Sequence, residues 1–482
     1  MAPMTLDSAT CYRALRARDA RFDGRFFVAV SSTRIYCRPI CTVKIPRFEN
    51  CGFYPSAAAA EVAGYRPCLR CRPELAPGNA SVDAISRVAQ AAAVLIEDQT
   101  LDAGGLAALA SHLGITDRHL RRAFGAEFGV SPVEFAQTQR LLLAKRLLTD
   151  TDLPVTEIAF ASGFGSLRRF NALFKQRYRL QPGLLRRQIH GKPGPVADVL
   201  NFELAFRPPY DWQAMSAFLG ARALAGVEMV EGGSYRRTVR MAAADKEFRG
   251  WIEIGLSPNK PALCVAVSAS LARALPPVLA RIKALMDLSC NPTEVAKALG
   301  RLAEPRPGIR VPGAFDGFEV AVRAILGQQV TVAAARTVAG RFAAALGDPI
   351  DTPFGELTTV FPTAARVADA TVGLIARLGM PAMRARAVVG LARSVADGNL
   401  MLAPGTDIDA TMERLQALPG LGEWTAQYIA MRALAWPDAY LHTDHGVMKA
   451  LGEKHARRVL KAGEAWRPWR AYAVMHLWNS VT

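Results

Sequence analysis

Long apolar stretches are absent from this chain of 482 residues, and cysteine is absent after Cys290. No uninterrupted apolar run approaches the roughly 20 residues that a membrane-spanning helix requires. The N-terminus also lacks the apolar core of a secretory signal peptide. We therefore expect a cytoplasmic protein with no membrane partner.

Acidic residues are scarce relative to basic ones. The chain has 42 Asp and Glu against 59 Lys and Arg, which gives a formal net charge of +17 and a pI of about 9.8. A charge of this size indicates a protein that binds a polyanion such as nucleic acid. The alternative is a soluble protein that is basic but has no such partner. The apolar share of 51% excludes a disordered chain, and the length predicts three or four domains.

Six of the eight cysteines fall within the first 71 residues. Four of them form two close pairs, Cys37-x3-Cys41 and Cys68-x2-Cys71, with 26 residues between the pairs. In a cytosolic chain such clustering indicates a metal rather than disulfides. Two short pairs allow two turns to meet around one tetrahedral zinc ion, and from the spacing alone this site could be purely structural.

The residues around these cysteines indicate a more specific site. Residues 35–41 (IYCRPIC) and 66–73 (RPCLRCRP) resemble the N-terminal domain of the Ada methylphosphotriester repair proteins. The resemblance implies that Cys37 accepts the methyl group of a methylated DNA phosphate in a stoichiometric transfer. Four thiolates on one Zn²⁺ leave a double negative charge, which keeps the sulfurs nucleophilic. We expect Cys11 and Cys51 to be ordinary cysteines outside this site.

Two similar helical segments follow between residues 80 and 190. Residues 106–124 and 155–174 each combine an apolar helix, a glycine turn, a Thr or Ser N-cap and a basic second helix. This is a helix-turn-helix present twice, and it resembles the AraC-type transcriptional regulators. Two such units on one chain can read adjacent major-groove segments without a dimer. We therefore expect a monomer that binds promoter DNA and works with RNA polymerase.

Basic residues outnumber acidic ones by thirteen to six between residues 115 and 190. We expect the polar side chains on the second helix of each unit to face the DNA: Arg118, Arg121, Arg122, Arg168, Arg169, Asn171 and Lys175. Any one of them could instead touch only phosphate or solvent. Because methylation of Cys37 would remove one negative charge, DNA binding should tighten afterwards. Residues 191–195 (GKPGP) are typical of a linker.

Residues 200 to 305 mix strand-like and helical segments. Residues 251–254 and 263–267 are predicted strands. The segments 206–212 (FRPPYDW) and 234–237 (SYRR) resemble the small α+β subdomain that precedes the catalytic core of the AlkA glycosylases. We expect this subdomain to be a supporting wall without chemistry of its own.

The segment 418–426 (LPGLGEWTA) predicts a tight turn at the start of a helix. Gly420 and Gly422 bare backbone N–H groups there, and a helix start of this kind favours a phosphate. A carboxylate, Asp444, follows 22 residues after Gly422 within residues 441–447 (LHTDHGV). Together these features resemble the helix-hairpin-helix DNA glycosylases and, within them, the AlkA or 3-methyladenine glycosylase II branch.

The resemblance assigns roles to particular residues. Asp444 would stabilise the positive charge on the sugar as the glycosidic bond breaks and would orient water, although an aspartate here could also be an ordinary helix cap. The extruded base would enter a pocket of electron-rich rings, formed by Trp424, Tyr428 and Trp478, that attracts cationic purines such as 3-methyladenine and 7-methylguanine.

Further positions are expected to hold the DNA. The hairpin residues Gly420, Gly422 and Thr425 would approach a phosphate, and Thr425 would help to cap the following helix. Gln329 matches the wedge position that fills the gap left by the extracted base. AlkA has leucine there, so a glutamine is a departure, and a plain helix-end amide is the alternative.

Three absences narrow the expected activity. Bifunctional glycosylases carry a lysine where this chain has Trp424, so no lyase step is expected. The endonuclease III branch has four cysteines for an iron–sulfur cluster after the aspartate, whereas this chain has none there. The second methyltransferase domain of the Ada family, with its Pro-Cys-His-Arg motif, is also missing.

The sequence therefore predicts a multidomain, mainly helical protein. We expect a zinc-binding α+β domain over residues 1–76, a double helix-turn-helix over 80–190, an α+β subdomain over 200–305 and a helical glycosylase core over 306–482. The predicted function is excision of alkylated bases from double-stranded DNA by a protein that also senses methylphosphotriesters with one zinc ion. The alternative is chiefly a transcriptional activator with a vestigial glycosylase.

Overall fold

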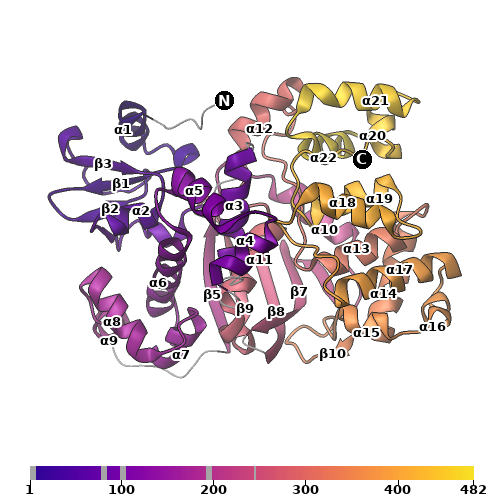
Figure 1. Cartoon of the computed structure of the whole chain (residues 1–482), viewed down its shortest axis with the longest axis horizontal. Helices are drawn as coiled ribbons and strands as arrows, with labels where there is room; N and C mark the ends of the chain where they lie inside the picture. The colour runs from indigo at the N-terminus through magenta and orange to yellow at the C-terminus, as the bar shows by residue number, and fades with distance from the viewer. Residues whose placement is uncertain (1–6, 78–83, 98–104, 191–197, 244–245, 482) are drawn as a thin grey trace.

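A computed structural model describes residues 7–77, 84–97, 105–190, 198–243 and 246–481 (Figure 1). The expected linker at 191–195 and the expected boundary near residue 80 lie outside these residues. None of the helices described is both long and apolar enough to cross a bilayer.

A four-stranded sheet forms the N-terminal module, with strand order β3-β1-β2-β4. Its elements are α1 (Ser8–Ala17), β1 (Phe27–Val30), β2 (Ile35–Cys37), β3 (Cys51–Tyr54), α2 (Ala57–Val62) and β4 (Arg66–Pro67). Strand β4 pairs in parallel with β2, and Tyr36 lies opposite Pro67. This register brings Cys37, at the end of β2, beside the cysteine that follows β4, so the sheet itself joins the two cysteine pairs.

Helices make up the second module, shown in violet to magenta in Figure 1. They are α3 (Ala84–Glu97), α4 (Gly105–His112), α5 (Asp117–Phe128), α6 (Pro132–Asp150), α7 (Val155–Ala161), α8 (Leu167–Tyr178) and α9 (Pro182–His190). The side chains of Thr116 and Ser166 accept hydrogen bonds from the first turns of α5 and α8. The predicted caps and the two helix-turn-helix units are thus confirmed.

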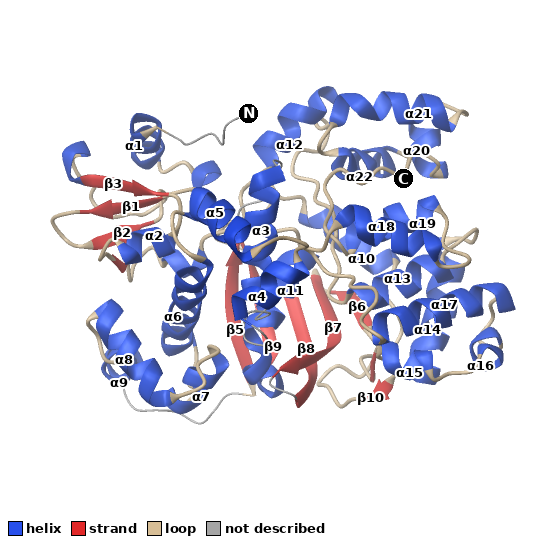
Figure 2. Ribbon diagram, in the orientation of Figure 1, coloured by secondary structure: helices blue, strands red, loops and turns tan. Residues whose placement is uncertain are grey.

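A five-stranded antiparallel sheet occupies the middle of the molecule, with strand order β5-β9-β8-β7-β6 (Figure 2). Its subdomain contains β5 (Val199–Ala205), α10 (Trp212–Ala221), β6 (Glu228–Glu231), β7 (Ser234–Ala243), β8 (Lys246–Leu256), β9 (Ala262–Ser268), η4 (Ala269–Ala274), α11 (Leu275–Leu285) and α12 (Pro292–Leu299). The strands predicted at 251–254 and 263–267 lie within β8 and β9.

The C-terminal part is almost entirely helical. It comprises α13 (Gly317–Leu326), α14 (Val332–Leu346), β10 (Asp348–Pro349), β11 (Thr359–Val360), α15 (Ala364–Ala368), α16 (Val372–Ala376), α17 (Ala382–Ala396), α18 (Ile408–Ala417), α19 (Glu423–Arg432), α20 (His445–Ala450), α21 (Ala456–Gly463) and α22 (Arg470–Ser480). The predicted multidomain, mainly helical architecture is confirmed.

Helix α6 links the N-terminal module to the central sheet. The Lys145 ammonium is buried and donates to both carboxylate oxygens of Glu74 at 2.7 Å. On the next residue, the Arg146 guanidinium donates to the backbone oxygen of Glu203 in β5 at 2.7 Å. Apolar side chains of α6 to α9 share one core with the sheet. The modules therefore pack as one body, and the four domain boundaries given above remain our proposal.

Candidate active site and zinc site

The carboxylate of Asp444 lies at the start of α20, half-buried at the wall of a cavity. Its Oδ1 accepts hydrogen bonds from the backbone N–H of Val447 at 3.1 Å and from Nε1 of Trp478 at 2.8 Å. Its Oδ2 accepts one from Nε1 of Trp424 at 3.0 Å. Asp444 is therefore a helix cap and a cavity-lining anion at the same time, which reconciles the two readings of this position.

Gly446 allows this arrangement. A Cβ atom at this position would lie 3.0 Å from Cδ1 of Trp478 and 3.1 Å from Oδ1 of Asp444. Both distances are tighter than ordinary carbon contacts, so any side chain would push the indole away from the carboxylate. The glycine in the LHTDHGV segment is therefore required by the close approach of α22 to the start of α20.

Aromatic rings line the cavity, whose volume is about 980 Å³. The rings of Trp424 and Tyr428 are stacked with centroids 5.3 Å apart and planes 14° apart. The Tyr428 and Trp478 rings are 6.5 Å apart and tilted by 42°. All three residues predicted to form the pocket thus line one cavity together with Asp444.

A fourth ring comes from an element to which we had assigned no chemistry. Phe218 of α10 stacks on Trp478 with centroids 6.3 Å apart. The guanidinium of Arg222, which follows the same helix, lies 3.8 Å from the Phe218 centroid. The small α+β subdomain therefore supplies part of the cavity and is more than a supporting wall. Its sequence carried no local signal for this role, because an aromatic residue in an apolar helix usually packs in a core.

Arginines also line the cavity: Arg222, Arg306, Arg323, Arg336 and Arg432. Arg432 donates from Nη1 to the hydroxyl oxygen of Tyr428 at 2.9 Å. Burial raises the pKa of Tyr428, but the charges of Arg432, Arg222 and Arg323 outweigh burial and leave that pKa below its ordinary value. The Arg323 guanidinium itself contacts Glu228 at 2.8 Å. The lining of the cavity is therefore both aromatic and cationic.

The hairpin between α18 and α19 has two glycines in different conformations. Gly420 has φ +89°, which favours glycine, and a Cβ there would lie 3.0 Å from that of Ala387. Gly422 is exposed, with no atom of the protein within 4 Å of a Cβ at that position. The fold itself thus leaves Gly422 open to an outside partner at the N-terminus of α19.

Thr425 differs from its expected arrangement. Helix α19 begins after Gly422 without a side-chain cap, so the expected capping by Thr425 is wrong. The Thr425 side chain is buried, and its hydroxyl accepts a hydrogen bond from Nε2 of Gln328 at 2.9 Å. The hydroxyl of Thr425 therefore joins the hairpin to the loop that carries Gln328.

Gln328 ties the hairpin to the loop that carries Gln329. Its Nε2 also donates to the backbone oxygen of Gly420 at 2.9 Å, and its own backbone oxygen accepts from Arg384 at 2.7 Å. The neighbouring Gln329 is exposed and has φ +55°, an uncommon backbone conformation for a residue with a side chain. Gln328 could not be predicted from its local sequence, because its role depends on a hairpin 92 residues away.

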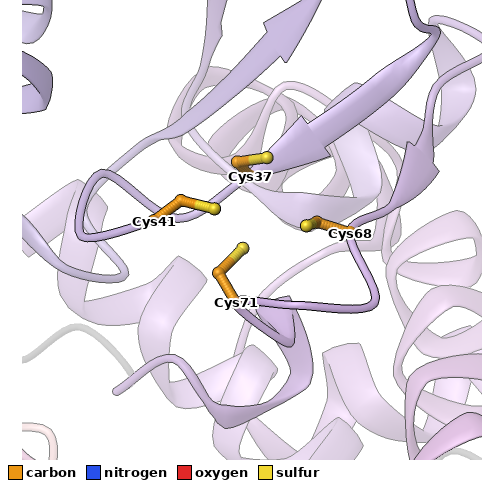
Figure 3. Close-up of side chains that lie close together, drawn as sticks. All are labelled: Cys37, Cys41, Cys68 and Cys71. Carbon is orange, nitrogen blue, oxygen red and sulfur yellow. The ribbon is translucent and has the colours of Figure 1, made fainter. Parts of the chain in front are cut away.

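The cysteines Cys37, Cys41, Cys68 and Cys71 converge as their spacing predicts (Figure 3). Their sulfur atoms all lie within 4.8 Å of one another. Backbone N–H groups also donate to two of the sulfurs, from Arg38 to Cys71 at 3.3 Å and from Arg70 to Cys68 at 3.4 Å. Four thiolates with this convergence fit a tetrahedral zinc ion.

The helix-turn-helix residues predicted to meet DNA are all exposed on α5 and α8: Arg118, Arg121, Arg122, Arg168, Arg169, Asn171 and Lys175. Arg121 also contacts Asp117, one turn earlier, at 2.9 Å. An exposed pair of this kind contributes little to stability, so Arg121 can exchange its partner for a phosphate.

Three family models match successive parts of the chain. The metal binding domain of Ada matches residues 10–74, a helix-turn-helix domain matches residues 109–188, and the AlkA N-terminal domain matches residues 201–316.

Curated proteins are similar over different lengths. A probable bifunctional transcriptional activator/DNA repair enzyme AlkA of Mycobacterium tuberculosis is 39% identical over 98% of this chain and 97% of its own. DNA-3-methyladenine glycosylase 2 of Escherichia coli is 38% identical over 58% of this chain and 96% of its own. The bifunctional transcriptional activator/DNA repair enzyme AdaA of Bacillus subtilis is 31% identical over 36% of this chain and 81% of its own.

Proposed function

Since the chain belongs to the family of bifunctional AlkA-type transcriptional activator/DNA repair enzymes, we propose that it is a monofunctional DNA glycosylase for alkylated bases such as 3-methyladenine and 7-methylguanine. The glycosylase is fused to a regulatory DNA-binding module. The observation that carries the proposal is the position of Asp444 at the wall of an aromatic cavity, where two indole N–H groups hold its carboxylate.

The geometry supports a simple hydrolytic sequence. The damaged base leaves the stack and enters the cavity beside Trp424, Tyr428 and Trp478. The carboxylate of Asp444 stabilises the positive charge that develops on the deoxyribose as the bond between C1′ and the base nitrogen breaks. Water then adds to C1′ and leaves an abasic site. Trp424 stands at the hairpin and offers no amine, so the strand stays intact.

Two segments near the cavity would contact the DNA. The exposed turn at Gly422 offers the backbone N–H groups at the start of α19 to a phosphate. Gln329, on the loop tied to that turn by Gln328, fills the gap in the duplex. Since the bonds of Gln328 fix the distance between the two, binding at the phosphate also places the wedge.

At the other end of the chain, we propose a methyl transfer from a DNA phosphotriester to Cys37. One zinc ion held by the four cysteines would keep their sulfurs ionised and nucleophilic. The Cys37 sulfur attacks the methyl carbon, the oxygen–carbon bond breaks, and the phosphate diester leaves with its negative charge. The methylated site carries one negative charge less, so binding to promoter DNA by α5 and α8 tightens.

A second function, regulation without repair, is favoured by the exposed arginines of α5 and α8. In that case the protein acts chiefly as a monomeric activator that recruits RNA polymerase, and the glycosylase domain is vestigial. Promoter affinity before and after methylation discriminates this function. The Cys37→Ala variant should show no gain of affinity, and a wild-type protein without such a gain contradicts the switch.

The experiment for the glycosylase is base release from methylated duplex DNA, with the released bases separated by chromatography. Wild-type protein should release methylated purines and leave alkali-labile sites in uncut strands. Strand cleavage without alkali would contradict a monofunctional enzyme. The absence of any released base would contradict the proposal as a whole.

A further inference from the structure

Helix α2 of the zinc module contacts the ends of α5 and α8, the second helices of the two helix-turn-helix units. Each of these helices has 12 residues, and their last residues are Phe128 and Tyr178. At the start of α2, the hydroxyl of Ser56 donates to the backbone oxygen of Phe128 at 2.7 Å. Near its end, the carboxylate of Glu61 accepts from the hydroxyl of Tyr178 at 3.2 Å. One short helix therefore joins corresponding points of the two units.

Both contacts are buried, since Ser56 is 5% and Glu61 is 3% exposed. The Glu61 carboxylate also accepts from the hydroxyl of Thr138 in α6 at 3.3 Å and from that of Tyr36 in β2 at 3.0 Å. Hydrogen bonds are directional and strong where water is excluded, so three donors from three elements fix the carboxylate in one orientation. The position of α8 relative to α2 is thereby fixed as well.

Close packing fixes the end of α5. Gly129 follows α5 with φ +72°, and a Cβ atom there would lie 3.3 Å from the Cβ of Ala59 in α2 and 3.3 Å from Cγ of Pro55. These distances leave little room for movement between α5 and α2. Ala58 and Ala59 also share one apolar core with Phe128.

Two recognition helices can read one duplex only if their separation and relative angle match the DNA. Adjacent major-groove segments on one face lie about 34 Å apart, which is one helical turn. Helix α6 is the covalent link between the two units, and Figure 1 shows α2 beside it. Apolar packing on the central sheet also holds α8, but apolar contacts are not directional. The hydrogen bonds of α2 add the directional constraint, so less freedom is lost when DNA binds.

We propose that Ser56 and Glu61 are positioning residues that fix the spacing at which the protein reads two DNA segments. This inference rests on the proposed reading of DNA by α5 and α8. It gives the zinc module a part in sequence recognition that is separate from methyl transfer at Cys37. Helix α2 acts through α5 and α8, and DNA that carries the right motifs at the wrong spacing is rejected.

The test uses a double variant that removes both contacts. In Ser56→Ala, Tyr178→Phe, the ends of α5 and α8 lose their hydrogen bonds to α2, while the aromatic ring stays. Ser56 is also the N-cap of α2. The matched control is therefore Thr363→Ala, Tyr36→Phe, which removes the N-cap of α15 and one phenol hydroxyl from the Glu61 carboxylate. The control keeps both contacts of α2 with α5 and α8.

Each full-length protein, purified with zinc, selects binding sites from duplexes with about 30 random base pairs, or about three helical turns. Wild type and control should select two motifs at a single spacing of about 10 base pairs. The double variant should select the same motifs over a range of spacings. A merely structural loss would lower the amount of DNA recovered without changing the spacing.

An insertion gives a quantitative measurement. Two extra base pairs between the selected motifs turn one motif by about 70° relative to the other. This insertion should lower the affinity of wild type and control at least about tenfold, and that of the double variant less than about threefold. On the duplex without the insertion, the double variant should bind about tenfold more weakly than wild type, because its helices lose more freedom on binding.

A double variant that keeps the single spacing and the full loss on insertion would overturn the proposal. A control whose spacing broadens equally would also overturn it, because the effect would then come from stability. If the thermal midpoint of the double variant lies well below that of the control, the single variants Tyr178→Phe and Tyr36→Phe decide, since each loses one hydroxyl at the same carboxylate. Equal spacing in these two contradicts the proposal. The proposed DNA reading itself fails in a different way, since the wild type would then select no pair of motifs.

Discussion

The indole Nε1 of Trp478 donates a hydrogen bond to Oδ1 of Asp444 at 2.8 Å, although 34 residues separate the two in the chain. The donor lies near the end of α22, and the acceptor lies before the first turn of α20. Helices α20 and α22 pack closely, as Figure 1 shows. The packing of two helices therefore fixes the direction of the carboxylate that is proposed to face the sugar.

The first prediction removes this hydrogen bond and keeps the ring. In Trp478→Phe the side chain can still stack on Phe218, but Asp444 loses one of its two indole donors. We expect kcat for base release to fall about 10- to 100-fold, since mispositioning by a fraction of an ångström is costly in a preorganised site. KM should change much less, as steady-state kinetics on methylated duplex DNA would show.

The matched control is Trp436→Phe. Trp436 is also partly buried against the same core but does not line the cavity. Its replacement should leave kcat within about twofold. Equal losses in the two variants would mean that Trp478 acts through the stability of the fold and not through Asp444.

The second prediction concerns a buried carboxyl between the zinc module and the second helix-turn-helix. Glu61 accepts hydrogen bonds from the hydroxyls of Tyr36, Tyr178 and Thr138 at 3.0, 3.2 and 3.3 Å. Burial raises its pKa to about 7. The folded state therefore holds this proton more tightly than the unfolded chain. The resulting stabilisation is complete below the pKa that this carboxyl has in the unfolded chain. It is lost as pH rises through about 7, the pKa in the folded state.

Glu61→Gln should remove this pH dependence. Between pH 5 and pH 8, the free energy of unfolding of the wild type should fall relative to that of the variant. The relative loss should be up to about 3 kcal/mol. Denaturant unfolding at the two pH values measures it. A difference that is the same at both pH values would mean that Glu61 does not change its protonation in this range.

The third prediction tests the metal. Cys68→Ser should lose the zinc ion, which metal analysis should find once per chain in the wild type. The variant should also lose its capacity to accept a methyl group and several kcal/mol of stability in the N-terminal module. Cys264→Ser, at an exposed cysteine on β9, should keep the zinc. Zinc retained by the first variant, or lost by both, would contradict the assigned site.

Features that depend on neighbouring residues could be predicted from the sequence, whereas features that depend on tertiary packing could not. The N-caps Thr116 and Ser166 were predictable because a cap depends on a few neighbouring residues. The convergence of the four cysteines followed from their spacing. The roles of Phe218, Gln328 and Glu61 were not predictable, because each depends on partners distant in sequence.

The arginines that line the cavity were not predicted, for the same reason. Arg222 and Arg432 lie 210 residues apart by number, and each is an ordinary arginine at the end of a helix. The Phe218 ring, which has both guanidinium groups within about 5 Å of its centroid, lies between them. The charge that lines a pocket is thus a property of tertiary structure, and the aromatic positions in the sequence did not reveal it.

The fourth prediction concerns the second recognition helix. The Arg168→Ala, Arg169→Ala double variant removes two exposed cations from α8. Promoter affinity should fall at least about tenfold at moderate salt, and the slope of log affinity against log salt should decrease by about 1 to 2. Fluorescence anisotropy with promoter DNA at several salt concentrations measures both quantities.

Two comparisons complete this experiment. Arg273→Ala, at an exposed arginine on the segment η4 (Ala269–Ala274), should leave both quantities unchanged. Base release from short methylated duplexes should also be unchanged in the double variant, because α8 does not line the cavity. A double variant that binds promoter DNA like the wild type would show that α8 does not read it.

The most direct measurement is single-turnover base release from 7-methylguanine duplex DNA by wild-type protein and by Asp444→Asn. An amide at this position carries no negative charge. Its single oxygen can still accept from Val447 and Trp478, or from Trp424. The account predicts a rate at least about 10²-fold lower for Asp444→Asn, with unchanged folding and DNA affinity. A variant that releases the base as fast as the wild type would contradict the role given to this carboxylate.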